Sequence, residues 1–192
     1  MSWLDRWIRT ARPTPLQLHG IPVELRSSRA DIDSSAVLQR LDEALTLAMT
    51  YQPHRFRHLV RDIRGIRVER FPTRGAFLPA ERVILTELTF LARRDISAAP
   101  VASSILHEGV HARVHAFRER VRQGAPDGDR DMAREERLCR RAELAFGEAL
   151  PPDLGSPVIA RALASLALPD RDVAPVVDWA LARARQDEVD RR

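Results

Sequence analysis

Three histidines at four-residue spacing stand in the segment ILHEGVHARVHAF, which covers residues 105–117. On an α-helix, His107 and His111 lie one turn apart on the same face, so their imidazoles can reach a single metal ion. Glu108 follows the first histidine and can reach a water molecule on that ion. This HExxH arrangement supplies two metal ligands and a carboxylate that accepts a proton from water as it attacks a carbonyl group. The spacing therefore predicts a zinc site with Glu108 as its general base.

The alternative interpretation is that these histidines are ordinary polar residues in the core or on the surface of a helix. Chance is a poor explanation of the spacing, because the chain has six histidines among 192 residues and random order rarely produces this pattern. The histidine face also adjoins a predicted apolar stripe, which consists of Leu106, Val110, Val114, Phe117 and Val121. We therefore expect the histidine pair to be at least partly buried.

His115 extends the histidine row by one more turn. A straight helix places it about 12 Å along the axis from His107, which is too far for both to bind one ion. A third histidine ligand in such motifs follows a bend, usually at a glycine, and the segment HARVH contains none. We expect His115 to support the site from outside, with ligation of another ion as the alternative.

The helix predicted to end near Ala149 offers the third ligand. Its buried seam falls at positions four and three residues apart, which read Met132, Glu136, Cys139, Glu143, Phe146 and Leu150. An unpaired carboxylate is costly to bury, so Glu136 and Glu143 need a metal, a histidine or an arginine as partner. We expect Glu136 to be the ligand and Glu143 its neighbour, with the reverse as the alternative. A rotated helix whose glutamates meet arginines in solvent is the remaining possibility.

This constellation resembles the gluzincin metallopeptidases, in which HExxH supplies two histidines and a downstream helix supplies a glutamate. The resemblance covers residues 66–150 and implies a zincin-like metal-site core. It implies that His107, His111 and Glu136 bind Zn²⁺ and that Glu108 is the catalytic base.

The segment GAFLPAERVIL is similar to the substrate-binding edge strand of the same family. Gly75 stands where that family often has asparagine, and Ala76 and Phe77 follow it as the other candidate substrate-binding residues. A peptide would pair with this edge as an added strand.

Two features depart from the gluzincin pattern. Arg140 occupies the position four residues after Glu136, where that family often has an acidic residue that orients a histidine. Glu143 would then have to take that role or be the ligand itself. The single tyrosine, Tyr51, is far from the motif in sequence, so the group that stabilises the oxyanion is unassigned; Arg113, Arg140 or a histidine are candidates.

The order of predicted elements gives an α+β fold class, a mostly helical zincin-like domain. A small antiparallel, hairpin-like sheet formed by IRVERF and RVILTEL carries an edge strand and precedes the HExxH helix. Helices are expected before it, one of them capped by Ser34 or Ser35. We expect residues 1–192 to form one domain, with an amphipathic helix at 1–15 and helices at 153–188.

Composition limits the partners. All 31 basic residues are arginines, and with 27 acidic residues the net charge is only +4, so nucleic acid is not an expected partner. Residues 1–12 combine Trp3 and Trp7 with arginines, which fits either packing on the protein's own domain or a partner subunit, the favoured interpretation, or peripheral contact with a membrane. No apolar run reaches the roughly 20 residues that span a bilayer, and no signal peptide is recognisable. A single cysteine suits a reducing compartment, so we expect a cytoplasmic protein.

The sequence thus predicts a zinc-dependent hydrolase, specifically a metallopeptidase in which zinc-bound water, activated by Glu108, attacks a peptide carbonyl. The expected substrate is a peptide or protein, and a non-peptide amide fits the same site. The alternative from another functional class is a non-catalytic, zinc-stabilised interaction module.

Overall fold

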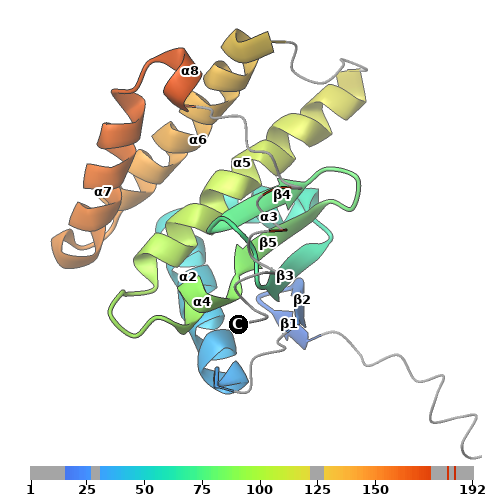
Figure 1. The fold of residues 1–192 in the computed structure, drawn as a ribbon, viewed down its shortest axis with the longest axis vertical. Coiled ribbons are helices and arrows are strands. Elements are labelled where there is room, and N and C mark those ends of the chain that lie inside the picture. Colours follow the sequence, from blue (N-terminus) through green and yellow to red (C-terminus); the bar gives the residue numbers. More distant parts are fainter. Residues whose placement is uncertain (1–15, 27–30, 122–127, 174–180, 182–183, 185–192) are drawn as a thin grey trace, which may run out of the picture.

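The fold was analysed in a computed structural model, which describes residues 16–26, 31–121, 128–173, 181 and 184. Long helices pack against a five-stranded sheet, so the predicted mostly helical α+β class is confirmed (Figure 1). The helices are α2 (Ser34–Tyr51), α3 (Pro53–Asp62), α4 (Leu88–Ala92), α5 (Ala99–Val121), α6 (Gly128–Ala149), α7 (Pro152–Leu166) and α8 (Asp170–Val173). The strands are β1 (Leu16–Leu18), β2 (Ile21–Leu25), β3 (Gly65–Glu69), β4 (Gly75–Leu78) and β5 (Val83–Glu87).

The sheet is mixed, with strand order β1-β2-β3-β5-β4. The predicted antiparallel pairing of the segments IRVERF and RVILTEL is wrong, because β3 and β5 run parallel, with Ile66 opposite Ile84. The chain between them forms β4, which turns back and pairs antiparallel with β5. The hairpin is therefore β4–β5, and β4 forms one edge of the described sheet.

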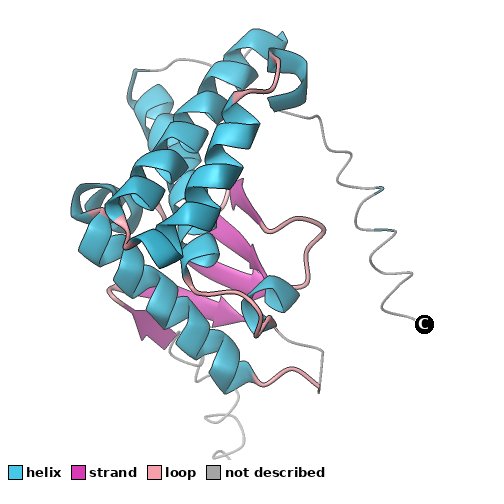
Figure 2. Ribbon diagram, turned by 90° about the vertical axis from the view of Figure 1, so that its left-hand side faces the viewer, coloured by secondary structure: helices cyan, strands magenta, loops and turns pink. Residues whose placement is uncertain are grey.

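The core lies between the sheet and the helices that cover one of its faces (Figure 2). Val23, Ile66 and Ile84 lie side by side on neighbouring strands and are buried in the same cluster as residues of α2 and α5. Residues directly opposite one another in a sheet share a face. Phe77 of β4, which is paired with Ile84, therefore faces the helices too.

The N-cap of helix α2 lies earlier in the chain than the sequence predicted. Asp33, and not Ser34 or Ser35, is the N-cap residue, and its side chain accepts a hydrogen bond from the backbone N–H of Ser35 at 2.9 Å. Asp and Ser are similarly good N-cap residues, so Asp33 can cap the helix in place of either serine. The period of apolar residues in this helix predicts one buried face with Val37, Leu41, Leu45 and Met49, and the first three are fully buried, whereas Met49 is 39% exposed.

Helix α5 is buried unevenly along its length. Its first half crosses the core, where Ala99 and residues 101–109 are buried, including Leu106 and His107. The predicted apolar stripe does not continue to the end of the helix, because Phe117 and Val121 are 52% and 51% exposed. The C-terminal half extends past the sheet and has fewer elements to pack on (Figure 1).

Helices α6 and α7 approach each other closely at two glycines. A methyl group at Gly155 would lie 2.3 Å from the carbonyl oxygen of Gly147, and one at Gly147 would lie 2.8 Å from a side-chain carbon of Ile159. Only glycine fits this crossing without displacing backbone. The contact fixes how α6 sits on the domain, and α6 carries Glu136 and Glu143.

Some predicted elements lie outside the described residues. The amphipathic helix at 1–15 is one of them, and so is most of the chain after Val173. Within the predicted C-terminal region, α7 and α8 are present and account for residues 152–166 and 170–173. Among the described helices, none combines the length and apolar character needed to cross a membrane.

We predict that Gly155→Ala destabilises the domain by about 1–3 kcal/mol, the usual cost of overpacking a well-packed contact. The added methyl group must displace the backbone of α6 at Gly147, because the clash is with a carbonyl oxygen and not with a flexible side chain. Urea unfolding measures the change. Ser156→Ala on the exposed neighbouring residue is the control and should stay within about 0.5 kcal/mol of the wild type. Equal stability of the two variants would contradict the role of Gly155 in this crossing.

Candidate metal centre

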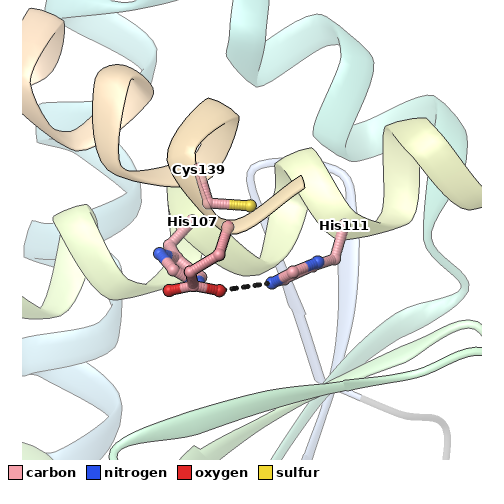
Figure 3. A group of neighbouring side chains, drawn as sticks. His107, His111 and Cys139 are labelled. Carbon is pink, nitrogen blue, oxygen red and sulfur yellow. Dashed lines mark ion pairs between the residues drawn. The ribbon is translucent and has the colours of Figure 1, made fainter. Parts of the chain in front are cut away.

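Helices α5 and α6 lie side by side and bring four potential metal ligands together (Figure 3). His107 and His111 come from α5, and Glu136 and Cys139 come from α6. One ligand atom from each of these residues lies within 4.8 Å of those of the other three. The sequence predicted three members of this group, and Cys139 is an addition.

The carboxylate of Glu136 lies between the two histidines. Its oxygens are 3.4 Å from Nε2 of His107 and 3.5 Å from Nε2 of His111. These separations exceed the 2.7–3.2 Å typical of an N–H···O hydrogen bond. Ligand atoms held tetrahedrally at about 2.0–2.1 Å from zinc lie about 3.3–3.4 Å apart. The spacing of the three side chains is therefore close to that of ligands around a shared ion.

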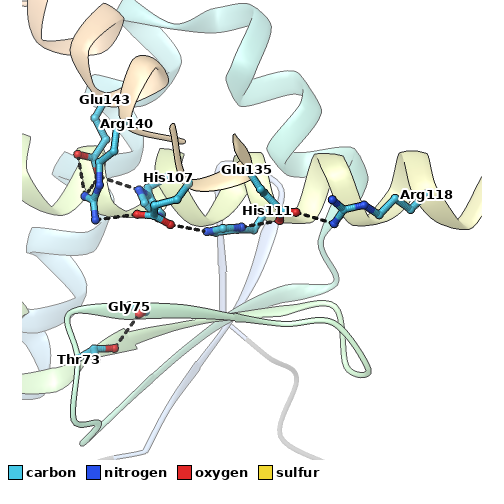
Figure 4. Close-up of polar contacts among 9 residues, drawn as sticks. Thr73, Gly75, His107, His111, Arg118, Glu135, Arg140 and Glu143 are labelled. Atoms are coloured by element: carbon cyan, nitrogen blue, oxygen red, sulfur yellow. Dashed lines mark hydrogen bonds and ion pairs between the residues drawn. The ribbon is translucent and has the colours of Figure 1, made fainter. Parts of the chain in front are cut away.

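The other ring nitrogen of each histidine faces a second carboxylate (Figure 4). Nδ1 of His111 makes a hydrogen bond with Glu135 at 2.7 Å, whereas Nδ1 of His107 lies 3.0 Å from Glu143 without hydrogen-bond geometry. Such carboxylates fix the tautomer and the ring orientation of histidine ligands and raise their basicity. Both rings are thereby turned so that Nε2 points to the centre of the group. Glu143 lies on the far side of His107 from that centre.

Two arginines hold these carboxylates in place. Arg118 of α5 pairs with Glu135 at 2.5 Å. Arg140 donates to both oxygens of Glu143, at 3.0 and 3.1 Å, and lies 2.8 Å from Glu136. Arg140 thus stands beside the group and is bound to carboxylates. It occupies the position where the gluzincin pattern has an acidic residue, and the contact to a histidine is made by Glu143 one turn further along α6.

The environment of the group favours positive charge on the histidines. Burial disfavours the imidazolium form of His107, but the carboxylates of Glu136 and Glu143 outweigh burial and raise its pKa to about 10. Burial likewise opposes the charged form of His111, whereas Cys139, Glu135 and Glu136 raise its pKa well above the ordinary value. Burial raises the pKa of Glu136, and the two histidines lower it by more. A buried group of side chains with this balance of charge is suited to a cation.

Glu108 lies between α5 and the edge strand β4. The residue is buried, and a methyl group placed on Gly75 would lie 3.4 Å from Cγ of Glu108 and 3.1 Å from the hydroxyl of Ser104. The strand can approach the helix this closely because position 75 has no side chain. The sequence predicted Gly75 and Glu108 as parts of one site, and the structure brings them into contact distance.

The backbone of β4 offers hydrogen-bonding groups at the open edge of the sheet. Glu87 donates its backbone N–H to the carbonyl of Arg74 across the β4–β5 ladder. Because antiparallel pairs alternate, the peptide groups of Ala76 point toward β5, and those of Gly75 and Phe77 point toward the edge. The side chain of Thr73 donates to the carbonyl of Gly75 at 2.8 Å (Figure 4). Of the three predicted substrate-binding residues, Gly75 and Phe77 thus direct their peptide groups to the edge, where Thr73 already binds the carbonyl of Gly75, and Ala76 directs its peptide groups to β5.

Other candidate residues lie outside the four-residue group. His115 contacts the ring of Phe77, with centroids 5.7 Å apart, and its Nε2 is 3.3 Å from Glu119. Arg113 is directed to Asp62 of α3, at 3.8 Å. Tyr51 packs against the core at the end of α2. Of the candidates for oxyanion stabilisation, only Arg140 is next to the group.

The donor set fits zinc. Two imidazoles, a carboxylate and a thiol are all groups that bind zinc in proteins. Sequence reasoning missed Glu135, which lies one position off the buried seam and gave no periodic signal. It also treated Cys139 only as an apolar member of that seam, although cysteine between two glutamates on one helix face was a usable signal.

Comparison of the chain with protein-family models, with curated proteins and with solved structures finds no match.

We predict that Glu136→Ala weakens zinc binding by more than about 100-fold, whereas Glu143→Ala weakens it by about 10- to 100-fold, the range typical of residues that orient ligands. Glu136 lies between both Nε2 atoms, but Glu143 reaches only Nδ1 of His107. Titration against a competing chelator measures both affinities, and circular dichroism verifies folding.

Glu148→Ala is the matched control, because Glu148 is exposed on the same helix. Its zinc affinity should equal that of the wild type. A larger loss in Glu143→Ala than in Glu136→Ala would reverse the two roles, and wild-type affinity in both would remove the third ligand.

Proposed function

We propose that this protein is a zinc-dependent hydrolase of peptide bonds, a metallopeptidase of the gluzincin type. The observation that supports this most strongly is the convergence of His107, His111 and Glu136, with both histidine Nε2 atoms within 3.5 Å of one carboxylate. Glu108 follows His107 in the chain, its carboxylate helps to raise the pKa of His107, and it lies against Gly75 of the edge strand. A metal site without a neighbouring carboxylate would not support hydrolysis equally well.

In this proposal, His107, His111 and Glu136 hold the zinc ion. Bound zinc supplies a Lewis acid that polarises a carbonyl and lowers the pKa of water. Glu108 accepts the proton of the attacking water and passes it to the leaving amine. Glu143 and Glu135 keep the two imidazoles oriented, and Arg140 holds Glu136 and Glu143 in position.

The proposed substrate is a peptide in extended conformation. It would pair with β4 through the backbone groups of Gly75 and Phe77, which face the open edge. That edge lies next to Glu108, so a bound strand would pass the general base. A non-peptide amide fits the same chemistry but makes no use of the edge.

A cytoplasmic setting is part of the proposal. Cys139 is a free thiol, and reducing compartments preserve thiols.

The second candidate function is a zinc-stabilised interaction module without catalysis. It is favoured by Cys139, because a fourth protein ligand would fill the coordination position that a hydrolase leaves open to water. The two functions differ in whether Glu108 does chemistry, and the following experiment separates them.

We predict that Glu108→Gln retains one zinc per chain and loses hydrolysis of peptides that the wild type cleaves. Glutamine keeps the size of the side chain but cannot accept and return the proton. Loss of general acid–base catalysis typically costs about 10²- to 10⁴-fold in turnover. Cleavage of a broad peptide library, with zinc content from elemental analysis, gives both measurements.

Glu148→Gln, at an exposed position on α6, is the control and should cleave at the wild-type rate. The proposal fails if Glu108→Gln turns over as fast as the wild type. It fails equally if zinc-loaded wild-type protein and its Cys139→Ala variant leave the whole library uncut, which would favour the interaction module.

A further inference from the structure

Cys139 is placed in the metal centre in a way that packing alone does not require. It is fully buried on α6, three residues after Glu136 and four before Glu143, so all three side chains share one face of the helix. Its neighbours in that position are imidazoles and carboxylates. Figure 3 shows its sulfur directed into the space between His107 and His111.

The distances allow the thiol to join the same ion as the other three ligands. The sulfur lies within 4.8 Å of the ligand atoms of His107, His111 and Glu136. In a tetrahedral centre with Zn–S of about 2.3 Å and Zn–N of about 2.0–2.1 Å, sulfur and nitrogen lie about 3.6 Å apart. A contraction of about an ångström, within the reach of side-chain rotation, closes this difference.

We propose that the thiolate of Cys139 is the fourth protein ligand of this centre and that it competes with water for the open coordination position. This inference rests on the metal site of the proposed function and adds a means of controlling it. With Cys139 bound, two imidazoles, a carboxylate and a thiolate close the site. With Cys139 withdrawn, that coordination position is open to water.

The donor set also determines which metal the site takes. Thiolate ligands select zinc and cobalt over magnesium, calcium and manganese, which prefer oxygen. A thiol becomes a ligand only as the thiolate, so metal binding here releases a proton from Cys139. The site is expected to hold Zn²⁺ or Co²⁺ in the presence of excess Mg²⁺.

Cobalt substitution tests the ligand directly, because a Co²⁺–thiolate bond gives a charge-transfer absorption in the near ultraviolet. Cys139 is the only cysteine of the chain, so that band has one possible source when the buffer contains no thiol. The full-length protein should bind one Co²⁺ and show the band. Cys139→Ala and Cys139→Ser should bind Co²⁺ more weakly and lose it, with folding verified by circular dichroism.

The wild-type spectrum decides the question even if a variant does not fold. A wild-type protein that binds Co²⁺ through His107 and His111 without the band overturns the inference, and so does a protein that binds no Co²⁺. A band that persists in Cys139→Ala overturns it as well.

Hydrolysis measured in the same samples separates this inference from the proposed function. If Cys139 closes the site, turnover by zinc-loaded Cys139→Ala should exceed that of the wild type and should still depend on Glu108. Hydrolysis that depends on Glu108 in a protein lacking the band leaves the proposed function intact and removes Cys139 as ligand. The band without hydrolysis in any variant supports the ligand and removes the hydrolase.

Discussion

Helix α6 presents three carboxylates to helix α5. Burying these carboxylates costs free energy, and the side chains at the centre of the molecule are arranged to offset that cost. A charged carboxylate removed from water is several kcal/mol too costly unless it has partners. Glu143 is 1% exposed and is compensated by His107 and Arg140. Glu135 has His111 and Arg118. Glu136 has Arg140 at 2.8 Å, and the two Nε2 atoms lie at distances longer than good hydrogen bonds, which leaves room for a cation among them.

The rest of the fold keeps those two helices and one strand at fixed spacing. Small residues occur where elements approach most closely: Gly155 lets α7 support α6, and Gly75 lets β4 lie over Glu108. Gly109, within the HEGVH motif, lets α3 approach α5, since a methyl group there would lie 3.0 Å from Leu59. Helix α5 is thus held on more than one side by close contacts at glycines. The charged residues of α5 are therefore not needed for the packing that holds the helix in place.

Sequence reasoning worked where a helical period alone determines position. His107, Glu108 and His111 depend only on the local geometry of α5, and Glu136 and Glu143 depend on the seam of α6. Glu135 was missed because its contact with His111 depends on the rotation of α6 against α5, which no local pattern encodes. The parallel pairing of β3 and β5 was missed for a similar reason. Strands separated by a short connection favour a hairpin, and the pairing changed because β4 took the outer position.

The peptide groups of β4 alternate in direction, and this alternation affects which chains could bind along the edge of the sheet. Gly75 and Phe77 direct their backbone to the edge and their side-chain positions to α5, and they are about 7 Å apart at the usual rise of a strand. A chain laid along this edge would be held at every second residue, and the residues opposite Gly75 and Phe77 would face the helix. The space beside position 75 is filled by Ser104 and Glu108, which a methyl group there would already meet at 3.1 and 3.4 Å, and Phe77 and His115 fill the next position. Selectivity for a bound chain would therefore depend on its residues that face the helix, which would lie near Ser104 and Glu108 at one position and near Phe77 and His115 two residues further on.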